Sequence, residues 1–406
     1  MKKCLILLMF GIFAIASLQA EEVLTLEKIL KRIQDNNLEL KSMQKQIEAA
    51  QSGIVQAGLF SNPELEIELG NFGKDEIGVG LGQTFELGGK RKNRKDLAKS
   101  ELKKTELELE MKNRELEISA IRGILPLLSA SEKLILLDSA IAIGQTTTET
   151  IRKRVKAGST VPVDLMRAEM DLEGLFLERR SADKELSQLH KNLPALWSES
   201  VVYFDKVSGN INEDVSIPSL EILKESLLEH PEIQMILLER KQSRLELKEA
   251  KISAIPDLSL GVGVTHETET EENSIGLTAG IELPIFNRNQ GYIKAKEHSN
   301  AALQFDADNT ILAKEAELQE LYNQLSIITD ELNTTKTKIL PKAETVFQTL
   351  LEYYERGSIS LLDVKEAQAE LLECNTGILD NLAARAELLT DLYELTGCKM
   401  KIIISE

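Results

Sequence analysis

The chain has 406 residues, with 48 basic and 66 acidic side chains and a formal net charge of −18. This acidic excess argues against binding to nucleic acid, or to anionic lipid, through bulk charge. Only 4% of the residues are aromatic, whereas Leu, Glu, Lys and Ala are abundant. Such a composition is typical of long helices rather than of a thick globular core.

Residues 1–20 are predicted to be a signal peptide. Two lysines precede an apolar run over residues 4–16, and Ala20 supplies a small residue at the cleavage point. The run is too short to span a membrane as a helix. After cleavage, Cys374 and Cys398 lie in one predicted helical stretch, which argues against a disulfide framework.

The first of two structural repeats is predicted over residues 21–200. Helical spacing of apolar residues indicates a helix over 25–59. The spacing then changes to strict alternation, which predicts a β-hairpin over 63–87. A long helical hairpin follows, with its tip near Gly158.

The second repeat is predicted over residues 220–397, after an irregular connector over 201–219. It again contains a helix, then a β-hairpin over 257–285, then a long helical hairpin with its tip near Gly357. Residues 398–406 form a C-terminal tail.

The returning helix of each hairpin is expected to be the shorter one, over about residues 162–197 and 361–396. Pro126 and Pro341 fall inside the longer arms, where a proline removes a backbone donor and crowds the preceding turn. We expect both arms to be kinked or interrupted there.

The two repeats align with each other, which indicates a tandem duplication. Residues 37–63 match residues 230–256 at an offset of 193. An offset of 199 then pairs the tip residues, namely Gly158 with Gly357, Ser159 with Ser358, and Asp164 with Asp363. Self-similarity at a long fixed period means that each copy builds an equivalent half of the molecule.

Each predicted strand is apolar on one face only, and its other face carries glycine, hydroxyl or carboxylate groups. About ten residues of such alternation are what a strand of an outer-membrane β-barrel requires. Two hairpins cannot close a barrel alone. Other copies of the chain are therefore expected to complete it.

The repeats resemble the TolC-like outer-membrane efflux protein family over essentially the whole mature chain. The resemblance rests on the strand entries at 62–65 (NPEL) and 255–258 (IPDL), on the duplicated glycine tips, and on the segments after each hairpin, 83–91 (QTFELGGKR) and 283–291 (LPIFNRNQG). The last two segments look most like the branch associated with cobalt, zinc and cadmium efflux.

The resemblance implies a mostly α fold with a small β part. It implies a homotrimer with a twelve-stranded outer-membrane barrel, four strands per chain, that continues into a periplasmic α-helical tunnel. The implied partners are outer-membrane lipid, a periplasmic adaptor protein and an inner-membrane RND-type pump. Many relatives carry an acylated cysteine at the mature N-terminus, but no cysteine stands at this cleavage point. Barrel insertion alone is expected to hold this chain.

Four glutamates are expected on the lumen face of the barrel: Glu64, Glu66, Glu68 and Glu282. Three copies would make the lumen acidic and favour cations. The alternative is that they are simply solvated side chains of the wall. No catalytic constellation, metal site or cofactor motif stands out, so an enzyme is not expected.

The tips carry the remaining candidates. Residues proposed to contact the adaptor are Gly158, Ser159, Gly357 and Ser358. Asp164 and Asp363 are either carboxylate rings of a periplasmic gate or acids that cap helix starts, and the two interpretations are compatible. Three further residues lie just before the turns: Arg154, Tyr354 and Arg356. They either tether neighbouring hairpins in a closed state or are simply solvated side chains at the tips.

The sequence therefore predicts a passive outer-membrane channel of a tripartite efflux system, with heavy-metal cations as candidate substrates. One alternative is the exit duct of a type I protein secretion system. A soluble periplasmic coiled-coil interaction protein is the alternative of a different class. Long helices fit it, but it gives no reason for strands that are apolar on one face.

Overall fold

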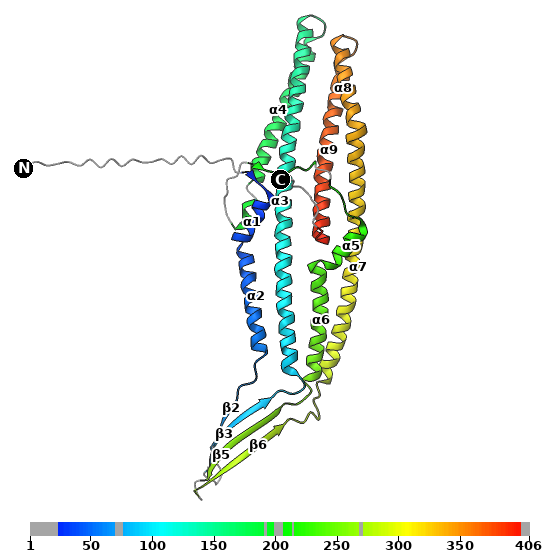
Figure 1. The fold of residues 1–406 in the computed structure, drawn as a ribbon. Helices are drawn as coiled ribbons and strands as arrows, with labels where there is room; N and C mark the ends of the chain where they lie inside the picture. Colours follow the sequence, from blue (N-terminus) through cyan, green and yellow to red (C-terminus); the bar gives the residue numbers. More distant parts are fainter. Residues whose placement is uncertain are drawn as a thin grey trace, which may run out of the picture.

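The computed structural model describes residues 23–69, 76–190, 193–198, 206–212, 215–267 and 271–398. The molecule is elongated, with one sheet at one end, two helical tips at the other, and long helices between them (Figure 1). The predicted signal peptide, most of the tail and part of the connector lie outside the described residues. The fold is mostly α with a small β part, as predicted.

The sheet has four antiparallel strands in the order β2-β3-β5-β6. Their bounds are Glu64–Leu69 (β2), Glu76–Phe85 (β3), Leu258–Glu267 (β5) and Glu272–Ile281 (β6). The two hairpins join through β3 and β5, where Leu81 pairs with Val262. The first and second repeats thus contribute equally to one continuous sheet.

The helix predicted over 25–59 is two helices, α1 (Leu26–Asn36) and α2 (Leu38–Ala57). Asn37 leaves helical geometry, with φ −62° and ψ 120°, and its side chain accepts hydrogen bonds from the backbone N–H groups of Glu39 and Leu40 at 2.9 and 3.0 Å. This is an N-cap. The second repeat has the same break at His230, between α5 (Leu220–Glu229) and α6 (Pro231–Ile252).

The long arm of the first repeat is a single helix, α3 (Lys90–Lys156), and α4 (Pro162–Leu189) returns from its tip. We expected a kink or an interruption at Pro126, and the structure excludes an interruption, because the helix continues through this residue. The residues on either side, Leu125 and Leu127, are buried, so tertiary packing holds this turn despite the missing donor. The return helix also stops before residue 197, and Leu193–Trp197 forms a short 3-10 turn (η1).

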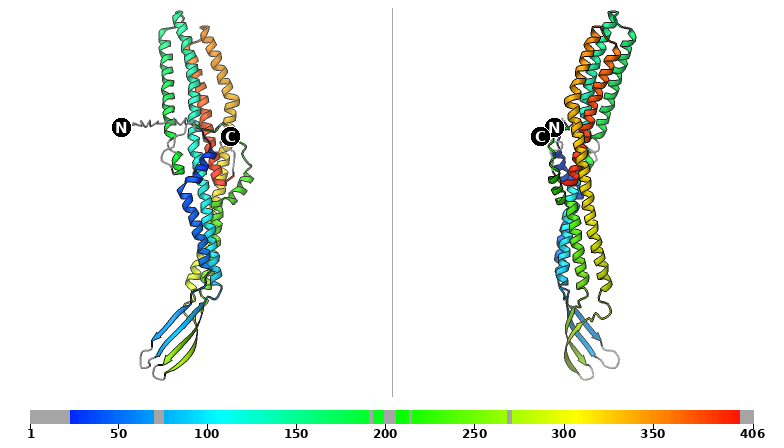
Figure 2. Two further views of the ribbon diagram at one scale, coloured as in Figure 1. Left: turned by 60° about the vertical axis from the view of Figure 1, so that its left-hand side comes forward. Right: turned by 90° about the vertical axis from the view of Figure 1, so that its right-hand side faces the viewer.

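The second arm is interrupted, as expected for Pro341. It consists of α7 (Gln290–Thr334), a π-helical turn η2 (Thr335–Ile339) and α8 (Leu340–Glu355). The return helix α9 spans Leu361–Thr396 and ends at Gly397 in left-handed geometry. Figure 2 shows these helices running side by side along the length of the molecule.

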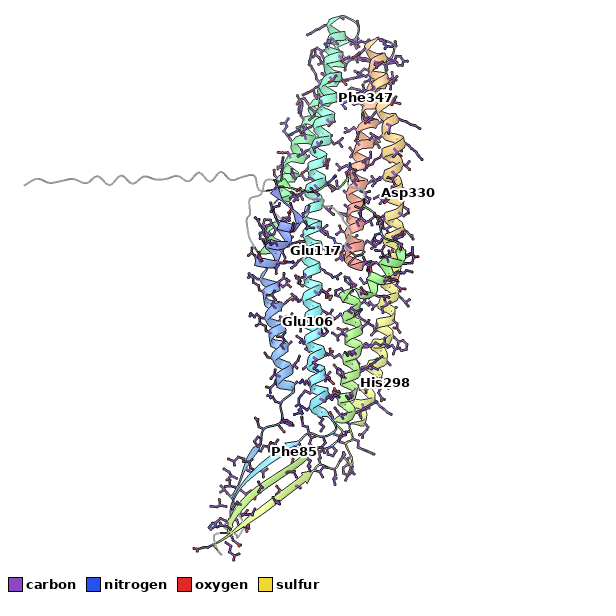
Figure 3. All side chains as sticks on the ribbon, viewed as in Figure 1. Phe85, Glu106, Glu117, His298, Asp330 and Phe347 are labelled. Atoms are coloured by element: carbon purple, nitrogen blue, oxygen red, sulfur yellow. The ribbon has the colours of Figure 1, made fainter. Side chains whose placement is uncertain are left out.

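The main hydrophobic core lies at mid-height, where helices of both repeats meet around fully buried residues such as Trp197, Ile124 and Leu223. A parallel pair of short strands, β1 (Val23–Leu24) and β4 (Lys206–Val207), adds to this region. A second cluster near the tips contains Phe347, labelled in Figure 3. None of the described helices combines the length and apolar character needed to cross a membrane.

Candidate functional site

The two helical tips have the same backbone geometry. Gly158 and Gly357 are left-handed, with φ +70° and +79°. In the first tip the N–H of Ser159 donates to the carbonyl of Arg154 at 2.9 Å, and in the second the N–H of Ser358 donates to the carbonyl of Tyr353 at 2.9 Å. These bonds close the last turn of each ascending helix and need a residue that tolerates positive φ.

Arg154 joins the two tips within one chain. Its guanidinium donates to the backbone carbonyl of Tyr354 and, at 3.3 Å, to the carbonyl of Ser159. Its Cζ lies 4.2 Å from the centroid of the Tyr354 ring, a cation–π distance, and Tyr354 is only 2% exposed. Of the three predicted tether residues, the structure brings these two together.

Arg356 does not reach the other tip. Its side chain is exposed and pairs with Glu352 one turn earlier at 3.4 Å, a pair that is worth little in solvent. Its Cζ also lies 6.0 Å from the ring of Tyr353. The structure therefore places Arg356 on the outer surface of the second tip, available to another molecule.

Asp363 starts α9 as part of a capping box with Ser360. The carboxylate accepts the backbone N–H of Ser360 at 2.9 Å and its hydroxyl at 2.7 Å, and the Ser360 hydroxyl oxygen accepts the N–H of Asp363 at 3.4 Å. The hydroxyl bond from Ser360 contributes most to holding the pKa of Asp363 below its usual range. This carboxylate therefore stays charged in mildly acidic solution.

Asp164 is held more loosely. Its carboxylate accepts the hydroxyl of Thr160 at 2.6 Å, while the residue at the cap position, Val161, offers no side-chain bond. Asp164 lines a cleft of about 380 Å³ between the two tips, together with Arg154 and Tyr354. Two basic residues that sequence reasoning missed, Arg167 and Lys365, also line it. Their positions three and two residues after the aspartates were visible in the sequence.

The glutamates of β2 lie on the glycine-rich face of the sheet. The register places Glu64, Glu66 and Glu68 opposite the glycines of β3. A Cβ atom on Gly78 would lie 3.4 Å from the Cβ of Glu68, so the acidic side chains cover the glycine positions. Glu282 follows β6 and lines a separate polar cleft with Asp257 and other polar residues at the base of the sheet.

The opposite face of the sheet is apolar and uncovered by this chain. Leu65, Val79, Val262 and Leu277 are between 50% and 84% exposed. Within the described part of the chain, no three His, Cys, Asp or Glu side chains are grouped closely enough to hold a metal ion. Three features are thus candidates for function: the apolar face of the sheet, the acidic face of the sheet, and the two polar helical tips.

The sequence matches the model of the outer membrane efflux protein family over residues 29–187 and 222–398. It is 27% identical over 385 residues to the cobalt-zinc-cadmium resistance protein CzcC of Cupriavidus metallidurans, covering 93% of this chain and 91% of that protein. It is 20% identical over 258 residues to the cation efflux system protein CusC of Escherichia coli O157:H7, covering 61% of this chain and 56% of that protein.

Solved structures agree with this relationship at the level of the fold. A crystal structure of CusC superposes with a TM-score of 0.75 at 18% identity, covering 91% of each chain. The outer membrane protein VceC of Vibrio cholerae superposes with a TM-score of 0.72 at 15% identity, covering 92% of this chain and 96% of that one. Since the family model matches most of its length, the chain belongs to the outer membrane efflux protein family.

Proposed function

We propose that three copies of this chain form a passive outer-membrane channel, with twelve strands in the barrel and the helices as a periplasmic tunnel. The four-stranded sheet carries the proposal. Its apolar face is exposed, and its outer strands β2 and β6 each have one unpaired edge. Open edges and uncovered apolar side chains are stable in a membrane only when further strands close the barrel.

The helices support assembly with further copies. Helix α4 exposes Val163, Met166 and Met170 at helical spacing, and α7 exposes Phe305 and Leu312. Apolar stripes of this kind on helices that lie at opposite edges of the chain suit side-by-side packing of copies. A soluble coiled-coil protein would account for the stripes but not for the sheet.

The substrate class we propose is heavy-metal cations. The acidic face of the sheet, with Glu64, Glu66 and Glu68, would present nine carboxylates to the lumen of a trimer and attract cations. One relative is named for cobalt, zinc and cadmium resistance, and another is named for cation efflux. The channel itself supplies a path rather than a reaction, so we assign it no catalytic residue and no cofactor.

The partners we propose are a periplasmic adaptor, which binds the tips at Gly158, Ser159, Gly357 and Ser358, and an inner-membrane RND-type pump. The equal geometry of the two tips supports this, because one adaptor surface could bind either tip. A type I secretion duct would need the same tips, so the two systems differ in cargo and pump.

Planar-bilayer recordings of the purified protein test this function. We expect cation-selective channels whose preference falls in Asp363→Asn and Asp164→Asn, because a ring of three charges at a narrow opening attracts cations. Asp35→Asn, an exposed carboxylate on α1, is the matched control and should not change selectivity.

The pH dependence sharpens the same test. Because the pKa of Asp363 lies below its usual range, the difference in cation preference between the wild type and Asp363→Asn should persist as the pH falls to about 4, the ordinary aspartate value. If Asp363→Asn lowers the melting temperature and leaves selectivity unchanged, the residue is only a helix cap. A protein that inserts no channel would refute the proposed function itself.

A further inference from the structure

A basic segment begins α3, directly after the sheet. Five of the six residues from Lys90 to Lys95 are basic, in a chain with an acidic excess. Figure 1 shows that α3 begins and α2 ends where the helices meet the sheet, and Phe85, at the end of β3, is labelled there in Figure 3. In an inserted channel this level is the boundary between the membrane and the periplasm.

Two of the five basic residues have carboxylate partners. Arg94 forms a bidentate pair with Glu86 at 2.6 and 3.1 Å, and it donates to the backbone carbonyls of Ala57 and Leu59. Lys90 binds Asp257 at 2.8 Å. These contacts link the start of α3 to the end of α2 and to the base of the sheet.

The other three, Arg91, Lys92 and Lys95, form what we name the basic junction patch. No carboxylate among the described residues pairs with them, and Lys92 and Lys95 are exposed. The Cζ of Arg91 lies 3.8 Å from the ring centroid of Phe60, which is 69% exposed. The patch therefore combines unpaired cations with an exposed aromatic ring.

The basic junction patch destabilises the start of α3 in the isolated chain. Helix α3 has no acidic residue in its first turn and no side-chain cap, and cations at a helix N-terminus oppose the helix dipole. Helix α7 also starts without an acidic residue in its first turn and without a side-chain cap, but Gly291, Tyr292 and Ala295 stand where α3 has Arg91, Lys92 and Lys95. The shared fold does not explain the patch, whereas an external anion would.

We propose that the basic junction patch, with Leu59 and Phe60, binds the phosphate headgroups of anionic phospholipids in the periplasmic leaflet of the outer membrane. The proposal rests on the proposed insertion of the sheet. Leu59 is 50% exposed beside Phe60, so the pair supplies apolar and aromatic contacts at the level where acyl chains meet headgroups. The overall negative charge does not oppose binding, because screening limits its reach to about 10 Å.

The test uses the full-length trimer, extracted from liposomes that contain phosphatidylethanolamine and phosphatidylglycerol, with native mass spectrometry to count retained lipids. The wild type should retain phosphatidylglycerol preferentially, and Arg91→Gln/Lys92→Gln/Lys95→Gln should reduce this preference about tenfold or more. The matched control Lys133→Gln/Lys184→Gln/Lys342→Gln removes the same charge from exposed positions nearer the tips and should retain it.

Lys92→Gln/Lys95→Gln keeps the contact between Arg91 and Phe60, so it serves if the triple variant fails to fold. This double variant should lose part of the preference. Equal retention of phosphatidylglycerol by the wild type and a folded variant would overturn the proposal. A variant with altered ion selectivity but unchanged lipid preference would overturn it too, because that result would place the patch in the lumen. A wild-type protein that forms channels but shows no lipid preference contradicts only this inference, whereas failure to insert contradicts the proposed function.

Discussion

The two repeats build the same backbone from different side chains. At the break before α2 the cap is Asn37, and at the equivalent break before α6 it is His230, whose Nδ1 accepts the N–H of Glu232 at 3.3 Å. An amide stays neutral at every pH that proteins meet, whereas an imidazole titrates. The comparison shows that the duplicated fold requires an acceptor at this position but leaves its chemistry free.

The long arms differ more. In the first repeat α3 continues through Pro126, and in the second a π-helical turn precedes Pro341. The neighbours of Pro126 are buried in the main core, while residues of the π-helical turn are intermediate or exposed. A proline is thus tolerated where packing holds the helix on both sides, and it disturbs the helix where packing is thinner.

The largest expected effect tests whether the two hairpins are equivalent in the membrane. Leu81→Arg and Val262→Arg lie on the apolar face and pair with each other, so each should cost about 2–4 kcal/mol near the middle of the barrel wall. We expect both variants to be lost from the outer-membrane fraction to the same extent. Gly80→Ser and Ser259→Asn, on the other face, should assemble normally. Equal tolerance of all four changes would mean that the strands do not cross the membrane.

A smaller effect should separate the two arginines at the tips. Arg154→Ala removes the donor to the Tyr354 carbonyl and the cation–π contact, at a cost of about 1–3 kcal/mol. Arg356→Ala removes an exposed pair with Glu352, which contributes less than about 0.5 kcal/mol, and a longer contact, at 6.0 Å, with the exposed Tyr353 ring. The melting temperature should fall more for Arg154→Ala than for Arg356→Ala. In single-channel recordings, only Arg154→Ala should open more often than the wild type. Identical melting temperatures would mean that Arg154 does not hold the tips together.

The smallest effect concerns the two caps. The pKa of His230 is lowered, mainly by burial and then by Arg114; Lys314 acts in the same direction, and Glu232 and Glu110 oppose it. Since the folded state resists protonation, stability should be complete above the ordinary histidine pKa of about 6.5 and should fall as the pH drops below it. Protonation also removes the acceptor for Glu232.

Exchanging the caps checks this directly. His230→Asn should reduce the fall in melting temperature between pH 7.5 and pH 5.0, and Asn37→His should increase it. Each change should correspond to a difference in the free energy of unfolding of up to about 1 kcal/mol, which is what one helix cap contributes. Melting curves of the wild type and both variants at the two pH values give the comparison. If the three proteins lose the same number of degrees, the imidazole has no part in the pH response.

Much of this fold could be predicted from local patterns. Strict alternation marked all four strands, and a glycine followed by serine marked both tips, because each depends on neighbouring residues alone. The break at Asn37 escaped prediction since the apolar spacing continues across it, and its amide donates to the carbonyl of Leu196, 159 residues away. The sequence marked Arg154 and Tyr354 as tether candidates by their places before the tips, but it did not show that these two residues, 200 positions apart, contact each other.

That tie sets how many parts can move independently at the mouth of the tunnel. A trimer has six helical tips, but Arg154 fastens the first tip of each chain to the backbone of the second. The two tips of one chain would then move together, so the mouth would open in three steps, one for each chain, rather than in six. Single-channel records of the wild type should contain at most two intermediate conductance levels, and Arg154→Ala should add more.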